Sequence, residues 1–167
     1  MAAALTVRPA TLQDAAAMTE IYNEGIADRI ATFETEPRSI QDVAAWFDAD
    51  RPIVAVVDAA DTIVGYAATF SYADRCCYAG IAEFSVYVRR SHRGQGVGAR
   101  AMTALIQACG EAGYWKLLSR VFVENAASLA LLQSVGFKRV GVHEKHGKLD
   151  GVWRDVVAVE RLIDANL

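Results

Sequence analysis

The sequence lacks several features that mark common protein classes. It has only three cysteines and three prolines in 167 residues, and its formal net charge is −3. A nucleic-acid-binding chain usually carries a basic face, which this charge balance does not favour. No apolar run is long enough to cross a bilayer, and the first residues do not resemble a signal peptide. We therefore expect no nucleic-acid partner, no membrane partner and a cytoplasmic location.

The few metal-binding and redox side chains do not form a recognisable set. Cys76, Cys77 and Cys109 are odd in number, and adjacent cysteines rarely pair with each other, which favours a reducing compartment. His143 and His146 form an HxxH pair, but no carboxylate or cysteine cluster completes a site around them. We predict no metal and interpret the two histidines as exposed residues near a strand end.

The hydrophobic pattern predicts one α/β domain over residues 1–167, because 53% of the residues are hydrophobic and the length allows one full core. Alternating or apolar runs predict strands at 4–8, 53–57, 62–70, 79–89, 117–123, 137–144 and 152–161. Helical spacing and capping residues predict helices at 11–28, from 39 on, 97–112 and 126–135, with a loop at 30–38. This order favours a largely antiparallel sheet.

The most informative stretch is residues 86–98. A β-branched and aromatic strand ends there in a basic cluster, followed by the turn Arg93-Gly94-Gln95-Gly96-Val97-Gly98 and a helical pattern. Successive backbone N–H groups of such a turn point at one place, and the positive end of the helix adds to them. The sequence therefore predicts a site for a phosphate or pyrophosphate.

Three glycine motifs bind phosphate in this way, and two of them fit poorly. A Walker A loop needs Lys-Ser or Lys-Thr, and neither dipeptide occurs in the chain. A dinucleotide fingerprint needs G-x-G-x-x-G after the first strand of its unit, whereas here the spacing is G-x-G-x-G after the fourth strand. A structural turn without a ligand is a further alternative. The third motif, R-x-x-G-x-G, matches.

This turn resembles the acetyl-CoA motif of the GNAT superfamily of N-acetyltransferases. The resemblance implies the GNAT fold, an α/β (α+β) domain whose central, mixed, mostly antiparallel seven-stranded sheet is flanked by four helices. It implies acetyl-CoA as the cosubstrate, bound by the strand at Val86, Tyr87 and Val88, by the turn residues Arg93, Gly94, Gln95, Gly96, Val97 and Gly98, and by Asn125 and Ser128. A plain helix cap is the alternative role for Asn125.

Four further segments resemble the phosphinothricin N-acetyltransferase branch of that family. They are residues 32–37, Arg75 with its eight-residue spacing to Glu83, residues 82–88 and residues 151–156. The branch acetylates the α-amino group of glutamate-like amino acids with a tetrahedral side-chain head, such as phosphinothricin, methionine sulfoximine and arsinothricin. The resemblance also implies a homodimer with pockets near the interface.

The acceptor site is expected around a short set of residues. Arg75 is expected to bind the α-carboxylate or the side-chain head of the acceptor through two parallel hydrogen bonds, although a solvated surface role is the alternative. The other substrate-binding residues that we predict are Phe33, Cys76, Cys77, Tyr78, Glu83 and Ser85. Phe33 can equally pack in the core, and Trp153 is expected there.

Glu83 is the predicted catalytic base, acting directly or through a water. A carboxylate inside an otherwise apolar strand is costly unless it has a task or a partner. The alternative is a purely structural ion pair with Arg75. A backbone N–H near Val86 is expected to stabilise the oxyanion.

Two steps of the predicted chemistry stay open. A covalent route through Cys76 or Cys77 is disfavoured because no histidine lies near them in the sequence. Many family members have a tyrosine that protonates the leaving thiolate, and here Leu132 occupies that position. Either the thiolate leaves unprotonated, or Tyr87, a water or another group donates the proton.

Two other functions remain compatible with the sequence. The first is acetyl transfer to another small amine, such as a polyamine or aminoglycoside, or to a protein N-terminus. The second is a non-catalytic CoA-binding module, which an intact Glu83 disfavours.

Overall fold

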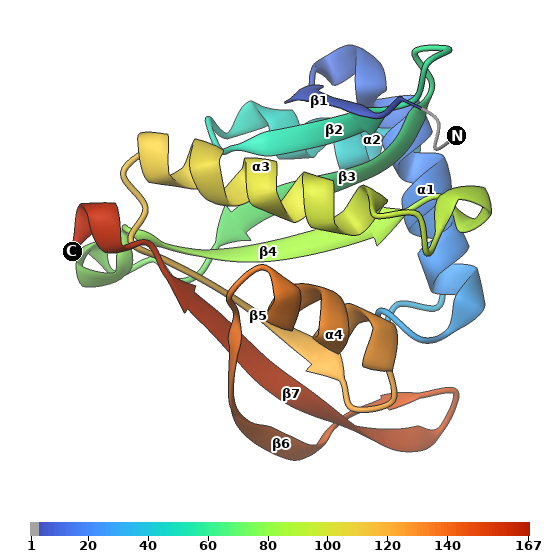
Figure 1. The fold of residues 1–167 in the computed structure, drawn as a ribbon. Helices are drawn as coiled ribbons and strands as arrows, with labels where there is room; N and C mark the ends of the chain where they lie inside the picture. Colours follow the sequence, from blue (N-terminus) through green and yellow to red (C-terminus); the bar gives the residue numbers. More distant parts are fainter. Residues whose placement is uncertain (1–3) are drawn as a thin grey trace.

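The computed structural model describes residues 4–167, and its strands form one seven-stranded sheet (Figure 1). The strands are β1 (Thr6–Pro9), β2 (Ile53–Val57), β3 (Ile63–Ser71), β4 (Ile81–Val88), β5 (Lys116–Phe122), β6 (Lys138–Leu149) and β7 (Val152–Leu162). They lie in the order β1-β2-β3-β4-β5-β7-β6. All neighbouring pairs are antiparallel except β4 and β5, which are parallel. The predicted fold class is therefore confirmed.

Helices cover both faces of the sheet, and the sequence pattern of the strands follows from this. The helices are α1 (Ala15–Asp28), α2 (Ile40–Ala44), α3 (Val97–Glu111) and α4 (Ala126–Ser134). Figure 1 shows α3 in front of strands β2 to β4, with α1 and α2 behind them. All five residues of β2 are buried because Val54 and Val56 join the core under α3, while Ile53, Ala55 and Val57 join the core under α1 and α2.

Strand β4 shows the same division with one consequence for function. Ala82 and Phe84 lie in the core under α3, whereas Tyr87 packs in the core under α1. Because side chains alternate along a strand, Glu83 and Ser85 are on the face of Tyr87. The carboxylate of Glu83 therefore lies on the face covered by α1, α2 and the loop between them.

Three predicted elements differ from the structure. The second helix loses its α-helical form after Ala44 and continues as a 3₁₀ turn, Ala45–Asp48. The first helix starts with a 3₁₀ turn in which the Asp14 carboxylate accepts the Thr11 backbone N–H at 2.8 Å. The third difference, in β6, arises from a bulge.

Strand β6 passes through the turn that was predicted at Gly147. His143 pairs with Val156 and Gly147 pairs with Arg154, so that β6 has extra residues in this stretch. The bulge accommodates them, and the backbone of Lys145 within it adopts φ 48°. Only Asp150 and Gly151, both with positive φ, form the turn between the two strands.

Trp153 was expected in the core, and that expectation is wrong. Its side chain is 53% exposed on β7, with the Lys148 Nζ 4.7 Å from the ring centroid. Val152 beside it is also exposed, at 56%, so that neither face of this end of β7 is covered, which the sequence pattern alone did not reveal. No helix within residues 4–167 is long and apolar enough to span a membrane.

Candidate active site

The site is built on the divergence of β4 and β5. Their parallel ladder contains only three residue pairs and ends at Glu83 and Leu118. Beyond that point β4 continues to Val88 and β5 to Phe122 without pairing with each other, and Figure 1 shows the two strands separating. The edge of β4 that faces β5 therefore has backbone groups free for another extended chain.

Three adjoining cavities occupy this divergence. All three are lined by Ala31, and the small middle cavity, about 60 Å³, shares Arg120 with one neighbour and Asn125 with the other. The shared lining places the three cavities side by side, and together they form a passage from the glycine turn, between the strands, to the loop after α1. The lining residues from β4 run from Glu83 to Val88.

The cavity at the glycine turn has a volume of about 300 Å³. The predicted cofactor residues that line it are Val86, Tyr87, Val88, Arg93, Gly94, Gly96, Val97, Gly98, Asn125 and Ser128. Gln95 does not line it, because its side chain turns back and donates to the Ser91 carbonyl at 3.2 Å.

The turn has the backbone geometry of an anion site. Gly94 and Gly96 have φ of 73° and 80°, a region that residues with a Cβ rarely adopt. Gly96 directly precedes α3, so the unpaired N–H groups of the first helical turn face the cavity. These main-chain donors and the helix dipole favour a phosphate group.

The basic cluster before the turn fastens it to α1. Arg90 and Arg93 both pair with Asp28, at 2.7 and 2.5 Å, and Arg89 pairs with Glu20 at 3.3 Å. The hydrogen bond from Arg90, with a further one from Arg93, holds the pKa of Asp28 below its usual value. Arg93 thus lines the cavity and braces the turn at the same time.

Asn125 caps α4 and also holds the loop after α1. Its Oδ1 accepts the Ser128 backbone N–H at 3.2 Å, and its Nδ2 donates to the Ile30 carbonyl at 3.2 Å. The cap that the sequence offered as an alternative is therefore present. Because Asn125 also lines the turn cavity, a contact with a ligand stays compatible with this geometry.

The cavity at the other end has a volume of about 370 Å³. Its lining consists of Ala31, Thr32, Phe33, Glu83, Ser119, Arg120, Phe122, His146 and Val156. Glu83 accepts a hydrogen bond from Arg120 Nη2 at 2.7 Å, so its charged partner is Arg120 and not Arg75. The Glu83 side chain is 30% exposed and reachable from the cavity.

Phe33 takes both roles that the sequence allowed. Its ring lies edge-on to Phe122, with centroids 4.8 Å apart, and it packs on the small buried cluster that includes Leu149 and Val156. A Cβ at Gly147 would lie 2.9 Å from the Phe33 ring, so glycine there permits the close approach. The same ring lines the 370 Å³ cavity.

The middle cavity contains groups suited to the reacting centre. The Ser85 Oγ is buried and has no hydrogen-bond partner among the described residues. Leu132 is 1% exposed and presents no donor. Burial raises the pKa of the Tyr87 hydroxyl above its usual value, so that it keeps its proton at neutral pH.

Four predicted substrate residues lie elsewhere. Arg75, Cys76, Cys77 and Tyr78 are exposed in and next to a 3₁₀ turn, and none lines the three cavities. The Arg75 guanidinium lies over the Tyr78 ring, 5.8 Å from its centroid. The structure thus brings Phe33, Glu83 and Ser85 together but does not bring these four residues to them.

The sequence did not single out Arg120, Ser119 or His146 as site residues. Arg120 and Ser119 enter the site only because the ladder ends at Leu118, and no sequence motif marks that point. His146 enters it through the bulge in β6, where Asp155 Oδ1 accepts the Lys145 backbone N–H at 2.7 Å. Within residues 4–167 no three His, Cys, Asp or Glu side chains are grouped as metal ligands.

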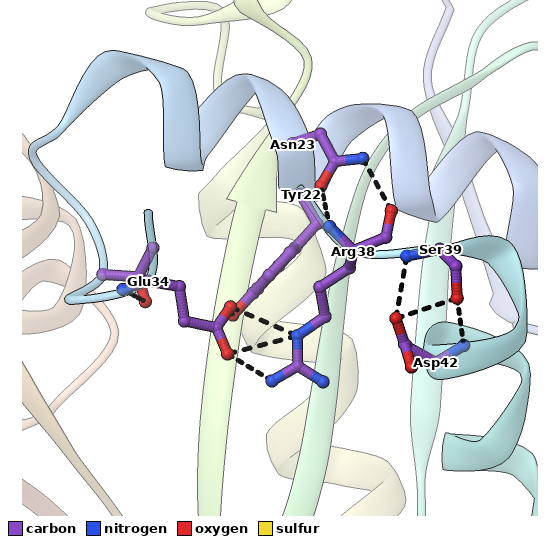
Figure 2. A network of polar contacts seen from close by, with 7 residues as sticks. Tyr22, Asn23, Glu34, Arg38, Ser39 and Asp42 are labelled. Atoms are coloured by element: carbon purple, nitrogen blue, oxygen red, sulfur yellow. Dashed lines mark hydrogen bonds and ion pairs between the residues drawn. The ribbon is translucent and has the colours of Figure 1, made fainter. Parts of the chain in front are cut away.

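The loop that carries Phe33 is held by a partly buried polar network (Figure 2). The Tyr22 hydroxyl donates to Glu34 Oε2 at 2.5 Å, and Arg38 donates to both oxygens of the same carboxylate. Asn23 exchanges two hydrogen bonds with the Arg38 backbone, at 2.9 and 3.0 Å. Burial raises the pKa of Glu34, but the bonds from Arg38 and Tyr22 outweigh it and the net pKa is lowered.

Replacing Glu34 by glutamine should loosen this loop. We expect a rise in the KM for the acceptor and a loss of about 1–2 kcal/mol of stability at pH 7, because Arg38 loses its charged partner. A lowered carboxyl pKa stabilises the fold above the unfolded value of 4.5, and this contribution disappears as the pH falls through the folded value. Urea denaturation should therefore show a gap between wild type and variant at pH 7 that narrows at pH 3.5. An equal gap at both pH values would contradict this role.

Comparisons with known proteins agree with this geometry. The model of the acetyltransferase (GNAT) family matches residues 18–137. An L-methionine sulfoximine/L-methionine sulfone acetyltransferase from Pseudomonas paraeruginosa is 30% identical over 163 residues, which cover 95% of both chains. A phosphinothricin N-acetyltransferase from Alcaligenes faecalis is 34% identical, covering 97% of this chain and 84% of that protein.

A solved structure is similar over nearly the whole chain. It is a GNAT superfamily phosphinothricin acetyltransferase from Sinorhizobium meliloti in complex with acetyl-CoA. The TM-score is 0.89 at 28% identity, covering 98% of this chain and 89% of that one.

Proposed function

The chain belongs to the acetyltransferase (GNAT) family, and on that premise we propose that it transfers the acetyl group of acetyl-CoA to the α-amino group of a glutamate-like amino acid. Methionine sulfoximine, phosphinothricin and arsinothricin are the acceptors we propose. The observation that carries the proposal is the row of three adjoining cavities in the β4–β5 divergence, with a phosphate-type turn at one end and Glu83 at the other.

Acetyl-CoA fits the turn side of this passage. In our proposal the N–H groups of residues 94–98 bind the pyrophosphate, and Asn125 and Ser128 lie beside the pantetheine arm. The main chain of Val86, Tyr87 and Val88 hydrogen-bonds that arm at the unpaired edge of β4. The arm then runs toward the middle cavity, where the Ser85 hydroxyl has no partner among residues 4–167.

Glu83 is positioned to accept the proton of the incoming amine. The acceptor arrives mostly as an ammonium ion, loses one proton to Glu83 directly or through a water, and attacks the thioester carbonyl through its nitrogen lone pair. The backbone N–H near Val86 stabilises the oxyanion. After the attack the nitrogen carries a positive charge and releases its second proton to water. The C–S bond then breaks, the amide forms and the thiolate leaves, so that the products are the N-acetyl amino acid and CoA.

The leaving group needs no strong acid in this proposal. Leu132 cannot donate a proton, whereas Tyr87 lines the same middle cavity and keeps its proton at neutral pH. A thiolate is also stable enough to leave without protonation, since thiols ionise near pH 8.5. Either route is compatible with direct transfer, and a covalent acetyl-cysteine has no support from the exposed positions of Cys76 and Cys77.

A homodimer in the cytoplasm is part of the proposal. Val140, Val142, Val152 and Trp153 are each more than half exposed on β6 and β7, and β6 is an edge strand of the sheet. Exposed apolar side chains on an edge strand are typical of a surface that another chain covers.

Arg75, for which we predicted acceptor binding, keeps that role only as a prediction.

A thiol-release assay with acetyl-CoA tests the proposal. We expect turnover with methionine sulfoximine, methionine sulfone, phosphinothricin or arsinothricin, and competition among them ranks the acceptors. Spermidine, kanamycin and a peptide with a free N-terminus form the comparison panel. Turnover with this panel alone would show that the acceptor is another amine and not a glutamate-like amino acid. CoA binding without thiol release on any amine would indicate a non-catalytic module.

A further inference from the structure

The acceptor cavity is the cavity of about 370 Å³ that Glu83 and Phe33 line. Arg120 reaches it from β5, just after the β4–β5 ladder has ended at Leu118. Its Nη2 donates to Glu83 Oε1 at 2.7 Å across the opening between the strands. Arg120 lines both the acceptor cavity and the middle cavity, and it is the one Lys or Arg among the lining residues of these two cavities within the described chain. The acceptor side of the passage therefore has one permanent positive charge beside one carboxylate.

The Arg120–Glu83 pair is open to replacement by a ligand. The side chains are 45% and 30% exposed, and a half-exposed ion pair contributes little to stability. Only the Nη2 of Arg120 has a protein partner among residues 4–167, so the rest of its planar fork is available. An arginine fork matches a carboxylate in geometry and charge.

The pair is complementary to an α-amino acid. Such an acceptor carries an ammonium group and a carboxylate on one carbon atom, so its two opposite charges lie side by side. Glu83 and Arg120 present the reciprocal charges side by side in the acceptor cavity, and Arg120 also lines the middle cavity next to it. A simple amine satisfies only Glu83 and leaves Arg120 without an added partner.

We propose that Arg120 binds the α-carboxylate of the acceptor and thereby makes the enzyme selective for α-amino acids over amines that lack this group. The inference rests on the proposed acetyl transfer to an amino acid. The carboxylate takes the fork of Arg120 while the amine faces Glu83, with its nitrogen toward the middle cavity. Phe33 and His146, which line the same cavity, are then left for the side chain of the acceptor.

The test pairs a change in the enzyme with a change in the substrate. Methionine sulfone is compared with its decarboxylated analogue, 3-methylsulfonylpropylamine, in wild type and in Arg120→Gln. We expect wild type to prefer the amino acid in kcat/KM by about 10- to 100-fold, the range of one charge-assisted pair. In Arg120→Gln the preference should fall to about threefold or less, which is what a neutral hydrogen bond from the glutamine can still contribute. Any effect of Arg120 on Glu83 itself acts on both substrates and cancels in the ratio.

Three further variants serve as controls. Arg139→Gln removes an exposed arginine on β6 outside these cavities and should keep the wild-type preference. Arg75→Gln tests the arginine favoured by the sequence, and loss of the preference there but not in Arg120→Gln would overturn the proposal. Arg120→Lys keeps the charge without the fork and should retain part of the preference, which also covers the case that Arg120→Gln does not fold.

The outcomes separate the inference from the proposed function. Wild-type turnover of methionine sulfone without any preference, or a preference unchanged in Arg120→Gln, would overturn the role of Arg120 and leave the acetyl transfer standing. Absence of wild-type turnover with methionine sulfone and every other amino acid would instead remove the proposed function and this inference with it.

Discussion

Replacing Glu83 by glutamine lowers kcat with an amino-acid acceptor by about 10²- to 10⁴-fold at pH 7, the usual contribution of a general base. Glutamine keeps the shape of the side chain and a hydrogen-bond acceptor for Arg120 but cannot take a proton. The affinity for CoA should change by less than about twofold, because Glu83 lines the acceptor cavity and not the turn cavity. Stopped assays give kcat, and isothermal titration gives the CoA Kd.

A matched control removes another carboxylate from the surface. Glu111 lies at the end of α3, and within residues 4–167 its side chain accepts a hydrogen bond only from Gln107, so Glu111→Gln should keep the wild-type kcat. If Glu83→Gln also kept it, Glu83 would be a structural partner of Arg120 and another group would be the base. A lowered kcat together with a much weaker CoA affinity would equally contradict the assignment of CoA to the turn cavity and of the acceptor to the cavity that contains Glu83.

Replacing Gly96 by valine weakens CoA binding by about tenfold or more, which corresponds to about 1.4 kcal/mol. The backbone of Gly96 has φ 80°, and a residue with a Cβ loses about 1–2 kcal/mol in the left-handed region. A Cβ at this position meets no atom of residues 4–167 within 4 Å, so the effect comes from the backbone and not from a clash. Relief of the strain turns the N–H groups at the start of α3 away from the phosphate site.

Gly113 provides the matched control for this variant. It follows the other end of α3, its φ is 87°, and a Cβ there also meets no atom of the described residues within 4 Å. Gly113→Val should therefore lower the thermal midpoint as Gly96→Val does, while the CoA Kd measured by titration stays at the wild-type value. Equal Kd values in the two variants would exclude a phosphate site at the turn.

The parts of the site that local patterns determine were predictable from the sequence. Two glycines just before a helix predict a turn that binds an anion through its backbone N–H groups, and the structure has positive φ at Gly94 and Gly96. The apolar run 53–57 requires burial on both faces, and β2 has it. In both places the signal and the structure lie in the same few residues, so that no distant contact decides the outcome.

The parts that depend on distant contacts were not predictable. Arg120 lies beside Glu83 only because β4 and β5 separate, which is decided by the packing of whole strands. His146 reaches the cavity through a bulge whose backbone is held by Asp155. Arg75 is close to Glu83 in sequence, yet a 3₁₀ turn and the start of β4 separate them in space.

The most direct test of direct acetyl transfer follows the acetyl group itself. The protein is mixed with [1-¹³C]acetyl-CoA and L-methionine sulfone, the product is examined by NMR, and the protein by intact mass. Direct transfer predicts a new amide carbonyl signal that correlates with the α-proton of methionine sulfone, and an unmodified protein mass. Label that accumulates on the protein at Cys76 or Cys77, or that stays in acetyl-CoA while the amino acid is unchanged, would contradict it.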